Sequence, residues 1–116
     1  LGDGHAAQGD GEIDGAAIET SFDTTFTVDL IKGKAISWPR LENDEVIMSI
    51  GSTRPLVDAL RIACADLVNW LVADHGYDKF EALQLLGQAA RIEVANVVDP
   101  QYSVACQIEK KYLPPQ

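Results

Sequence analysis

The sequence predicts an α+β fold, in which a two-helix hairpin packs on one face of a mainly antiparallel sheet. Strand-like patterns occur between positions 18 and 52, helical spacing continues to position 90, and β-branched residues return after it. Strands and helices therefore occupy separate blocks, without the strand–helix–strand alternation of a parallel sheet. At 116 residues the chain has room for one domain, which we expect to span residues 1–116.

The first predicted strand covers Ile18–Leu30, where every second residue is apolar or β-branched and the residues between are mostly polar. This period of two is typical of a strand with one buried face, or of a bulged pair of strands. Gly33 is expected to provide a turn before a short strand over residues 35–39. After a polar turn, the apolar run of residues 45–52 predicts another strand, which stops at Gly51.

A long helix is predicted after this strand. Ser52 or Thr53 can cap it, Pro55 suits its first turn, and Gly76 suits its C-terminal cap. Apolar residues at helical spacing form one stripe, made of Leu56, Leu60, Ala63, Cys64, Leu67 and Leu71. We expect this stripe to lie on the sheet.

A second helix is predicted over residues 79–90, because Asp78 and Glu81 form the pattern of a capping box before it. The short joint between the helices makes them a hairpin. Residues 91–99 could prolong this helix, but their β-branched side chains and the following proline favour a strand. A last strand alternates over residues 102–108, with one face made by Tyr102, Val104, Cys106 and Ile108.

The charge of the chain argues against two classes of partner. Its formal net charge is −9, so nucleic acid phosphates and anionic lipid surfaces would both repel it. No stretch approaches the ~18 apolar residues of a membrane helix, and no signal-peptide pattern opens the chain at Leu1. We expect neither nucleic acid nor a membrane as a partner, and a cytoplasmic location.

The two cysteines, Cys64 and Cys106, fall on different predicted elements and lack the spacing of a zinc finger or a redox motif. We expect two buried free thiols in a reducing compartment. Burial in the apolar stripe is expected to raise the pKa of Cys64 and to lower its reactivity. Trp38 and Trp70 are interpreted as residues of the core or of its edge.

The densest group of chemically active side chains is the opening segment LGDGHAAQGDGE, residues 1–12. Asp3 and His5 are one residue apart, so in extended backbone they fall on the same side and could share a metal ion such as zinc. Glu12 or Asp10 could then act as a base toward metal-bound water. The competing interpretation is a solvated Gly/Asp loop that carries no site.

A calcium loop is the rival metal interpretation. Counted from Asp10, the residues Glu12, Asp14 and Gly15 fall where an EF-hand loop needs them, but the twelfth position is Ser21 instead of Glu. Predicted strands also flank the segment, where an EF-hand requires helices. We interpret the match as accidental and keep calcium only as an alternative ion.

Other catalytic patterns are missing from the sequence. No GxSxG or SxxK surrounds a serine, and no P-loop lysine follows the glycines. The chain has two histidines, and His75 falls at the end of the predicted long helix, where a cationic side chain complements the helix dipole. We do not expect a complete catalytic triad within this chain.

Several segments resemble the C-terminal part of the acetamidase/formamidase family. In chain order they are GDGHAAQGDGEI, AIET, VDLIKGK, WPRLEND, the helical stretch ALRIACADLVNWLVADHGYDKFEALQLL and VANVVDP. The first motif is specific, and together the segments cover nearly the whole chain. The resemblance implies an enzyme that hydrolyses small unsubstituted amides, such as formamide or acetamide, to the carboxylic acid and ammonia.

The resemblance implies roles for five residues of the GDGHAAQGDGE motif. Asp3 and His5 are implied as metal or substrate contacts, and Gln8, Asp10 and Glu12 as residues that line the site or support those contacts. Among them we expect Glu12 to be the base, with Asp10 as the second candidate. The implied cofactor is a divalent metal, zinc with calcium as the alternative. The implied mechanism is metal-assisted hydrolysis, in which a carboxylate carries the proton to the departing ammonia.

The resemblance also implies that a larger, mainly β N-terminal region is absent from this chain. That region would pack on this domain and supply further histidines, either within one longer chain or as a separate chain. The start at Leu1 is then expected to reflect processing, a cloned fragment or a split enzyme. The alternative is a non-catalytic assembly domain, whose long helical stripe forms the interface of a homo-oligomer.

Overall fold

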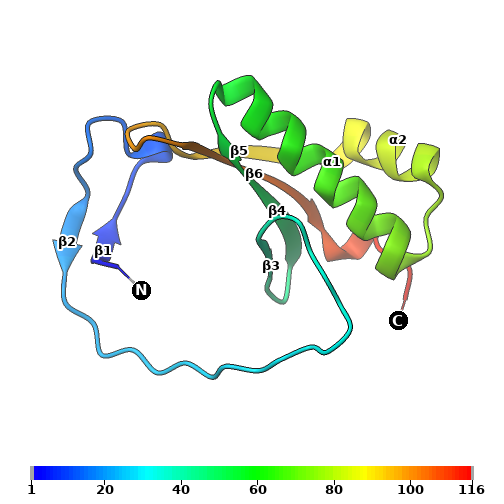
Figure 1. Cartoon of the computed structure of the whole chain (residues 1–116), viewed down its shortest axis with the longest axis horizontal. Helices are drawn as coiled ribbons and strands as arrows, with labels where there is room; N and C mark the ends of the chain where they lie inside the picture. The colour runs from blue at the N-terminus through cyan, green and yellow to red at the C-terminus, as the bar shows by residue number, and fades with distance from the viewer. Residues whose placement is uncertain (1, 116) are drawn as a thin grey trace.

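The computed structural model describes residues 2–115, so Leu1 of the opening segment lies outside the described residues. In those residues the fold consists of two antiparallel sheets and two α-helices (Figure 1). The elements are β1 (Gly4–Ala7), η1 (Asp10–Glu12), β2 (Ile18–Thr20), β3 (Arg40–Glu42), β4 (Val46–Thr53), α1 (Leu56–His75), α2 (Lys79–Ala89), β5 (Arg91–Asn96), β6 (Tyr102–Glu109) and η2 (Lys110–Tyr112).

The main sheet has the strand order β3-β4-β6-β5, and every neighbouring pair is antiparallel. The hairpin of α1 and α2 packs against this sheet, with α1 over β4 and β6 (Figure 1). The predicted α+β class is therefore confirmed. The strands predicted near residues 91–99 and 102–108 are present as β5 and β6.

The core fills the space between the helix hairpin and the sheet. Leu67 and Leu71 of α1 lie against Ile47 of β4 and Ile108 of β6, and all four side chains are fully buried. Each such side chain contributes roughly 1.5–3 kcal/mol by leaving water. Trp70 is also buried and Trp38 is half-buried, as expected for a core residue and a residue at the edge of the core.

The helix ends show which capping signals operate. Gly76 ends α1 in the left-handed conformation, with φ of 74°, and Asp78 and Glu81 form the expected capping box of α2. The predicted cap of α1 by Ser52 or Thr53 is wrong, because both residues continue β4 in pairing with β6. The predicted stop of that strand at Gly51 is wrong for the same reason.

The strand predicted over Ile18–Leu30 is wrong beyond Thr20, and residues 35–39 form no strand. A strand needs a neighbour for its backbone hydrogen bonds, and within residues 2–115 no strand pairs with residues 21–36. These residues run as an extended segment away from the main sheet and back to β3 (Figure 1), and we call them the strap. Its exposed apolar side chains are Phe22, Phe26, Val28, Leu30, Ile31 and Ile36.

None of the helices in the described residues is long and apolar enough to cross a bilayer. Cys64 and Cys106 are both free thiols, as expected, although only Cys106 is fully buried. The cytoplasmic location stays a prediction.

Candidate functional site

The opening segment forms a small hairpin that is tied to the end of β5. β1 pairs with β2 so that His5 lies opposite Glu19, and the register shifts between His5 and Ala7. Gly11 is buried with a positive φ of 78°, and its carbonyl accepts a hydrogen bond from the Val97 N–H at 2.9 Å. A Cβ at Gly11 would lie 3.2 Å from Val97 Cγ2. The positive φ therefore favours glycine at this position, and any larger residue would also displace the Val97 side chain slightly.

His5 is held by a neighbour in the same motif. Its Nδ1 lies 2.8 Å from Gln8 Oε1, which can only accept, so Nδ1 carries the proton. Gln8 in turn donates through Nε2 to the Ala95 carbonyl at 3.3 Å. In the neutral imidazole this arrangement leaves the lone pair on Nε2, and the amide of Gln8 fixes the ring.

Glu12 is the half-buried carboxylate of the segment. Asn96 at the end of β5 donates through Nδ2 to Glu12 Oε2 at 3.2 Å and to Asp99 Oδ2 at 2.9 Å. The Asn96 Oδ1 accepts from the N–H groups of Val98 and Asp99, which fixes the amide within its own turn. Glu12 is thus positioned from β5, 84 residues away in the sequence.

The structure brings the predicted residues together only in part. His5 contacts Gln8, and Glu12 lies on the same β5 end as Gln8, whereas Asp3 and Asp10 are exposed. Within residues 2–115 no cluster of three or more His, Cys, Asp or Glu side chains could hold a metal ion. Strands β1 and β2 flank the segment, as expected against an EF-hand.

Sequence reasoning missed the role of Asn96. The residue lies in VANVVDP, one of the segments that carry the family resemblance, but nothing in that stretch predicts contact with Glu12. The available signal was the pattern Asn-x-x-Asp, which is typical of a side-chain-stabilised turn. Its partner across the fold could not be read from spacing.

A hollow of about 500 Å³ lies beside Gln8 and is lined by Ala7, Gln8, Gly9, Ala16, Ala17 and Ile18. Hollows of this volume are large enough for small-molecule ligands. It is formed by the predicted site segment and by the start of β2.

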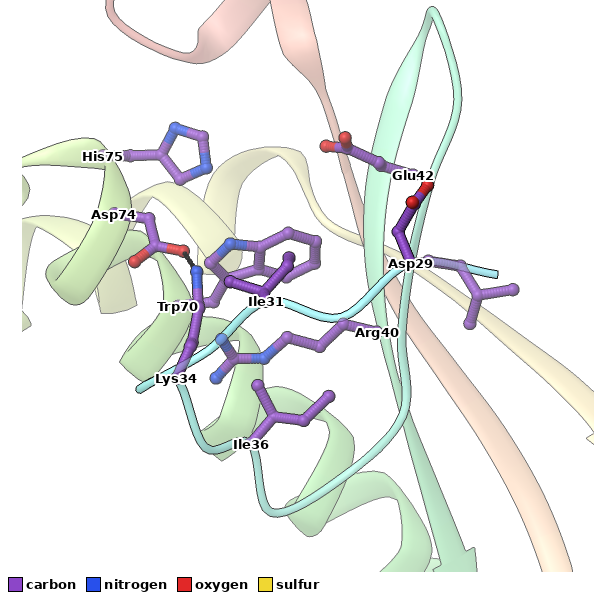
Figure 2. Close-up of a pocket in the computed structure, with 10 residues that line it drawn as sticks. Asp29, Ile31, Lys34, Ile36, Arg40, Glu42, Trp70, Asp74 and His75 are labelled. Carbon is purple, nitrogen blue, oxygen red and sulfur yellow. Dashed lines mark hydrogen bonds and ion pairs between the residues drawn. The ribbon is translucent and has the colours of Figure 1, made fainter. Parts of the chain in front are cut away.

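A second pocket of about 500 Å³ lies between the strap, β3 and α1. Figure 2 shows Trp70 at its centre, with Lys34 directed toward Asp74 and Arg40 beside the indole. Hydrogen bonding to Lys34 lowers the pKa of Asp74, and the Arg40 guanidinium lies 5.1 Å from the Trp70 ring centre. No residue of the opening segment lines this pocket. It is therefore separate from the candidate site.

The antiparallel sheet with its helix hairpin forms an α+β domain that is similar to part of two solved acetamidases. The chain matches the Acetamidase/Formamidase family over residues 1–111 and belongs to that family. No match is found among the curated proteins.

Three solved structures are similar to this chain. The acetamidase from Yersinia enterocolitica has 53% identity and a TM-score of 0.92, over 96% of this chain and 34% of that one. The acetamidase from Bacillus halodurans has 29% identity and a TM-score of 0.84, over 93% and 37%. A predicted acetamidase/formamidase from Thermoanaerobacter tengcongensis, at 23% identity, a TM-score of 0.77 and 92% and 36% coverage, shows the fold alone. The chain spans about a third of the length of these relatives.

Proposed function

We propose that this chain forms part of the active site of an amidase that cleaves small aliphatic amides, such as formamide and acetamide, to the carboxylic acid and ammonia. Family membership and the two acetamidases among the similar structures support this reaction. For the residues of this chain, the proposal rests on two hydrogen bonds: one from His5 to Gln8, and one from Asn96 to Glu12. Side chains held in this way are positioned before a substrate arrives.

The donor set of the segment fits a shared metal site. Catalytic zinc uses three protein ligands, and a metal-bound histidine usually donates its other ring N–H to an oxygen, as His5 does to Gln8. Asp3 and His5 would hold the divalent metal, zinc or alternatively calcium, which when bound favours ionised water and polarises the amide oxygen. The remaining ligands are proposed to come from the part of the enzyme outside this chain.

Glu12 is proposed as the general base, with Asp10 as the second candidate. Its carboxylate accepts a proton from water as the water oxygen bonds to the amide carbon, and then gives that proton to the nitrogen, which leaves as ammonia. The Asn96 amide holds one oxygen of Glu12, so the other is available for the proton. Gln8 is proposed to orient the amide beside the hollow that it lines.

The proposal is tested in a chimera in which this chain replaces the matching third of the Yersinia enterocolitica acetamidase. His5→Ala is expected to lower kcat/KM for ammonia release by at least roughly 100-fold, because the loss of a ligand exceeds the loss of its support. A chelator should abolish activity, and zinc should restore it. His75→Ala is the matched control, since His75 ends α1 outside the opening segment.

Full activity of His5→Ala, or activity that resists chelation, would refute the metal site. Gln8→Ala distinguishes the hydrogen bond that orients His5 from metal coordination by His5 itself. It should weaken metal binding, although the His5 side chain is still present. If the chimera is active and substitution of His5 or Asp3 leaves its activity unchanged, the amidase proposal stands, but the roles proposed for these two residues are wrong.

We further propose that the strap forms the interface between this chain and the rest of the enzyme. Its side chains alternate between apolar and polar, yet Phe26 and Val28 are 64% and 81% exposed. An exposed apolar strand-like segment marks an interaction surface, and a backbone with free hydrogen-bonding groups can add to the edge of another sheet. The occupant we infer is the region that this chain lacks relative to its solved relatives.

Charge placed on the apolar side of the strap is expected to prevent assembly. Phe26→Asp with Val28→Asp should abolish 1:1 co-purification with the uncovered two thirds of the Yersinia enterocolitica acetamidase, expressed as a separate chain, because buried unpaired carboxylates are costly. Thr25→Asp with Thr27→Asp adds the same charge on the polar side and should leave the complex intact. Equal binding by both variants would contradict the proposal that the strap forms this interface. Self-association of the chain without the complex would assign the strap to a homo-oligomer.

A further inference from the structure

The two cysteines of the chain meet between α1 and β6. Cys64 lies on the helix face that packs on the sheet, and Cys106 lies on β6 opposite Ser49 of β4. Their Sγ atoms are 3.5 Å apart. Cys106 is fully buried, whereas Cys64 is half-buried at the edge of the core. Of the two residues, Cys64 is therefore the more exposed.

The close approach of the thiols follows from the small residues beside them. Gly51 on β4 lies directly under α1, where a Cβ would be 2.0 Å from the Ala59 carbonyl oxygen and 2.9 Å from the Ala63 nitrogen. Ala59 and Ala63 are themselves fully buried. The helix backbone therefore rests on the sheet one residue before Cys64. A disulfide has an S–S length of about 2.05 Å, so the sulfur atoms need to approach by roughly 1.5 Å.

The pair is chemically unequal. The hydrogen bond with Cys106 lowers the pKa of Cys64 from 9.0 to about 7, although burial opposes the shift. The same hydrogen bond, burial and the charge of ionised Cys64 raise the pKa of Cys106. The expectation of a raised pKa for Cys64 is therefore wrong: burial acts in that direction, but the hydrogen bond with Cys106 of β6 outweighs it. A thiolate beside a protonated thiol is the arrangement of a nucleophile and a resolving cysteine.

We propose that Cys64 and Cys106 form a reversible oxidation site, in which a hydroperoxide converts the two thiols into an intramolecular disulfide. The Cys64 thiolate attacks one oxygen of the hydroperoxide, the O–O bond breaks, and Cys64 becomes a sulfenic acid. The other oxygen leaves as hydroxide or alkoxide and takes up a proton from solvent, which replaces the proton that Cys64 released on ionisation. The Cys106 sulfur then attacks the Cys64 sulfur, the S–O bond breaks, and the Cys106 proton leaves with that oxygen as water. Two thiols thus supply the two electrons that reduce one hydroperoxide.

This site is independent of the proposed amidase. The thiols lie between α1 and β6, whereas the opening segment contacts Val97, beyond the end of β5. The disulfide would join residues 42 positions apart and tie the helix hairpin to the sheet. It would also consume the sulfenic acid before further oxidation can make the damage irreversible.

The site is tested on the reduced chain with one equivalent of hydrogen peroxide, followed by alkylation of the remaining thiols and measurement of the intact mass. The expected product is a monomer that has lost about 2 Da, carries no alkyl group and regains both thiols on reduction. The oxidised monomer should also melt at a higher temperature, because the cross-link restricts the unfolded chain.

Two variants test the order of events. Cys106→Ala should stop at a sulfenic acid on Cys64 that dimedone traps, and Cys64→Ala should keep a reduced Cys106, because that thiol is fully buried. An unchanged wild-type mass with two alkylated thiols would overturn the proposal. Disulfide-linked dimers, or oxidation of Cys64→Ala as fast as that of the wild type, would overturn it as well.

Discussion

Gly51→Ala is expected to destabilise the chain by roughly 3 kcal/mol or more, because overpacking against backbone cannot be relieved by a side-chain rotation. The added Cβ would lie 2.0 Å from the Ala59 carbonyl oxygen and 2.9 Å from both the Ala59 carbonyl carbon and the Ala63 nitrogen. All three atoms belong to the α1 backbone. The α1 helix would have to move away from β4, and this movement would weaken the contacts of Leu67 and Leu71 in the core.

Gly87→Ala is the matched control for this change. It adds the same methyl group inside α2, where a Cβ would meet nothing within 4 Å. It should stabilise the chain by about 0.5–1 kcal/mol, since alanine restricts the unfolded chain and favours helix. The free energy of unfolding from urea denaturation measures both variants. A value for Gly51→Ala within about 0.5 kcal/mol of the wild type would show that α1 does not rest on the sheet there.

Local signals in the sequence predict the helix hairpin well. Gly76 and the pair Asp78 and Glu81 act through groups only a few residues apart, so their chemistry can be read directly. The role of Gly51 could not be predicted in this way. In the sequence it is typical of a strand end, but the reason for the glycine is a helix backbone that packs over it from later in the chain.

The strap shows the opposite case, in which a correct local pattern gives a wrong element. The alternation over Ile18–Leu30 is that of a strand, yet only residues up to Thr20 pair, with β1. The periodicity shows which side chains favour burial, but a strand also needs a neighbouring strand for its backbone hydrogen bonds. In the described residues that neighbouring strand is missing, which agrees with a chain that spans about a third of its solved relatives.

The candidate site was predictable as a segment but not as an arrangement. The GDGHAAQGDGE motif locates His5, Gln8 and Glu12, and the contact of His5 with Gln8 lies within one short stretch. The groups that hold them from β5, the Ala95 carbonyl and the Asn96 amide, come from the far end of the sequence. Side chains brought together by the fold carry no spacing signal.

The same limit applies to the buried ion pair of the core. Asp66 lies on the buried face of α1, where the predicted stripe contains only apolar residues, and it meets Arg40 at the start of β3. Arg40 Nε donates to Asp66 Oδ2 at 2.8 Å and Nη2 to Oδ1 at 3.1 Å, and Ser49 Oγ donates to Oδ2 at 2.8 Å. All polar atoms of this carboxylate are therefore paired.

Arg40→Ala is expected to cost about 3–5 kcal/mol of unfolding free energy at neutral pH, since it leaves a buried carboxylate with one hydroxyl partner. It also removes the guanidinium from the Trp70 ring. Arg61→Ala is the control, because its pair with Asp58 is 74% and 46% exposed and should contribute less than about 1 kcal/mol. Equal losses from the two arginines would contradict a structural role for the buried pair.

The pH dependence of the loss identifies its origin. Burial raises the pKa of Asp66, but the hydrogen bonds from Arg40 and Ser49 outweigh it and hold the pKa below 3.8. A lowered folded pKa gives stability that is present above 3.8 and is lost as the pH falls through the folded value. In Arg40→Ala the hydrogen bonds from Arg40 no longer offset the effect of burial on the pKa of Asp66. On acidification Asp66 is therefore protonated at a higher pH in the variant than in the wild type, and protonation removes the destabilising buried charge. The stability gap between wild type and Arg40→Ala should therefore narrow as the solution is acidified, whereas a gap independent of pH would assign the loss to packing against Trp70.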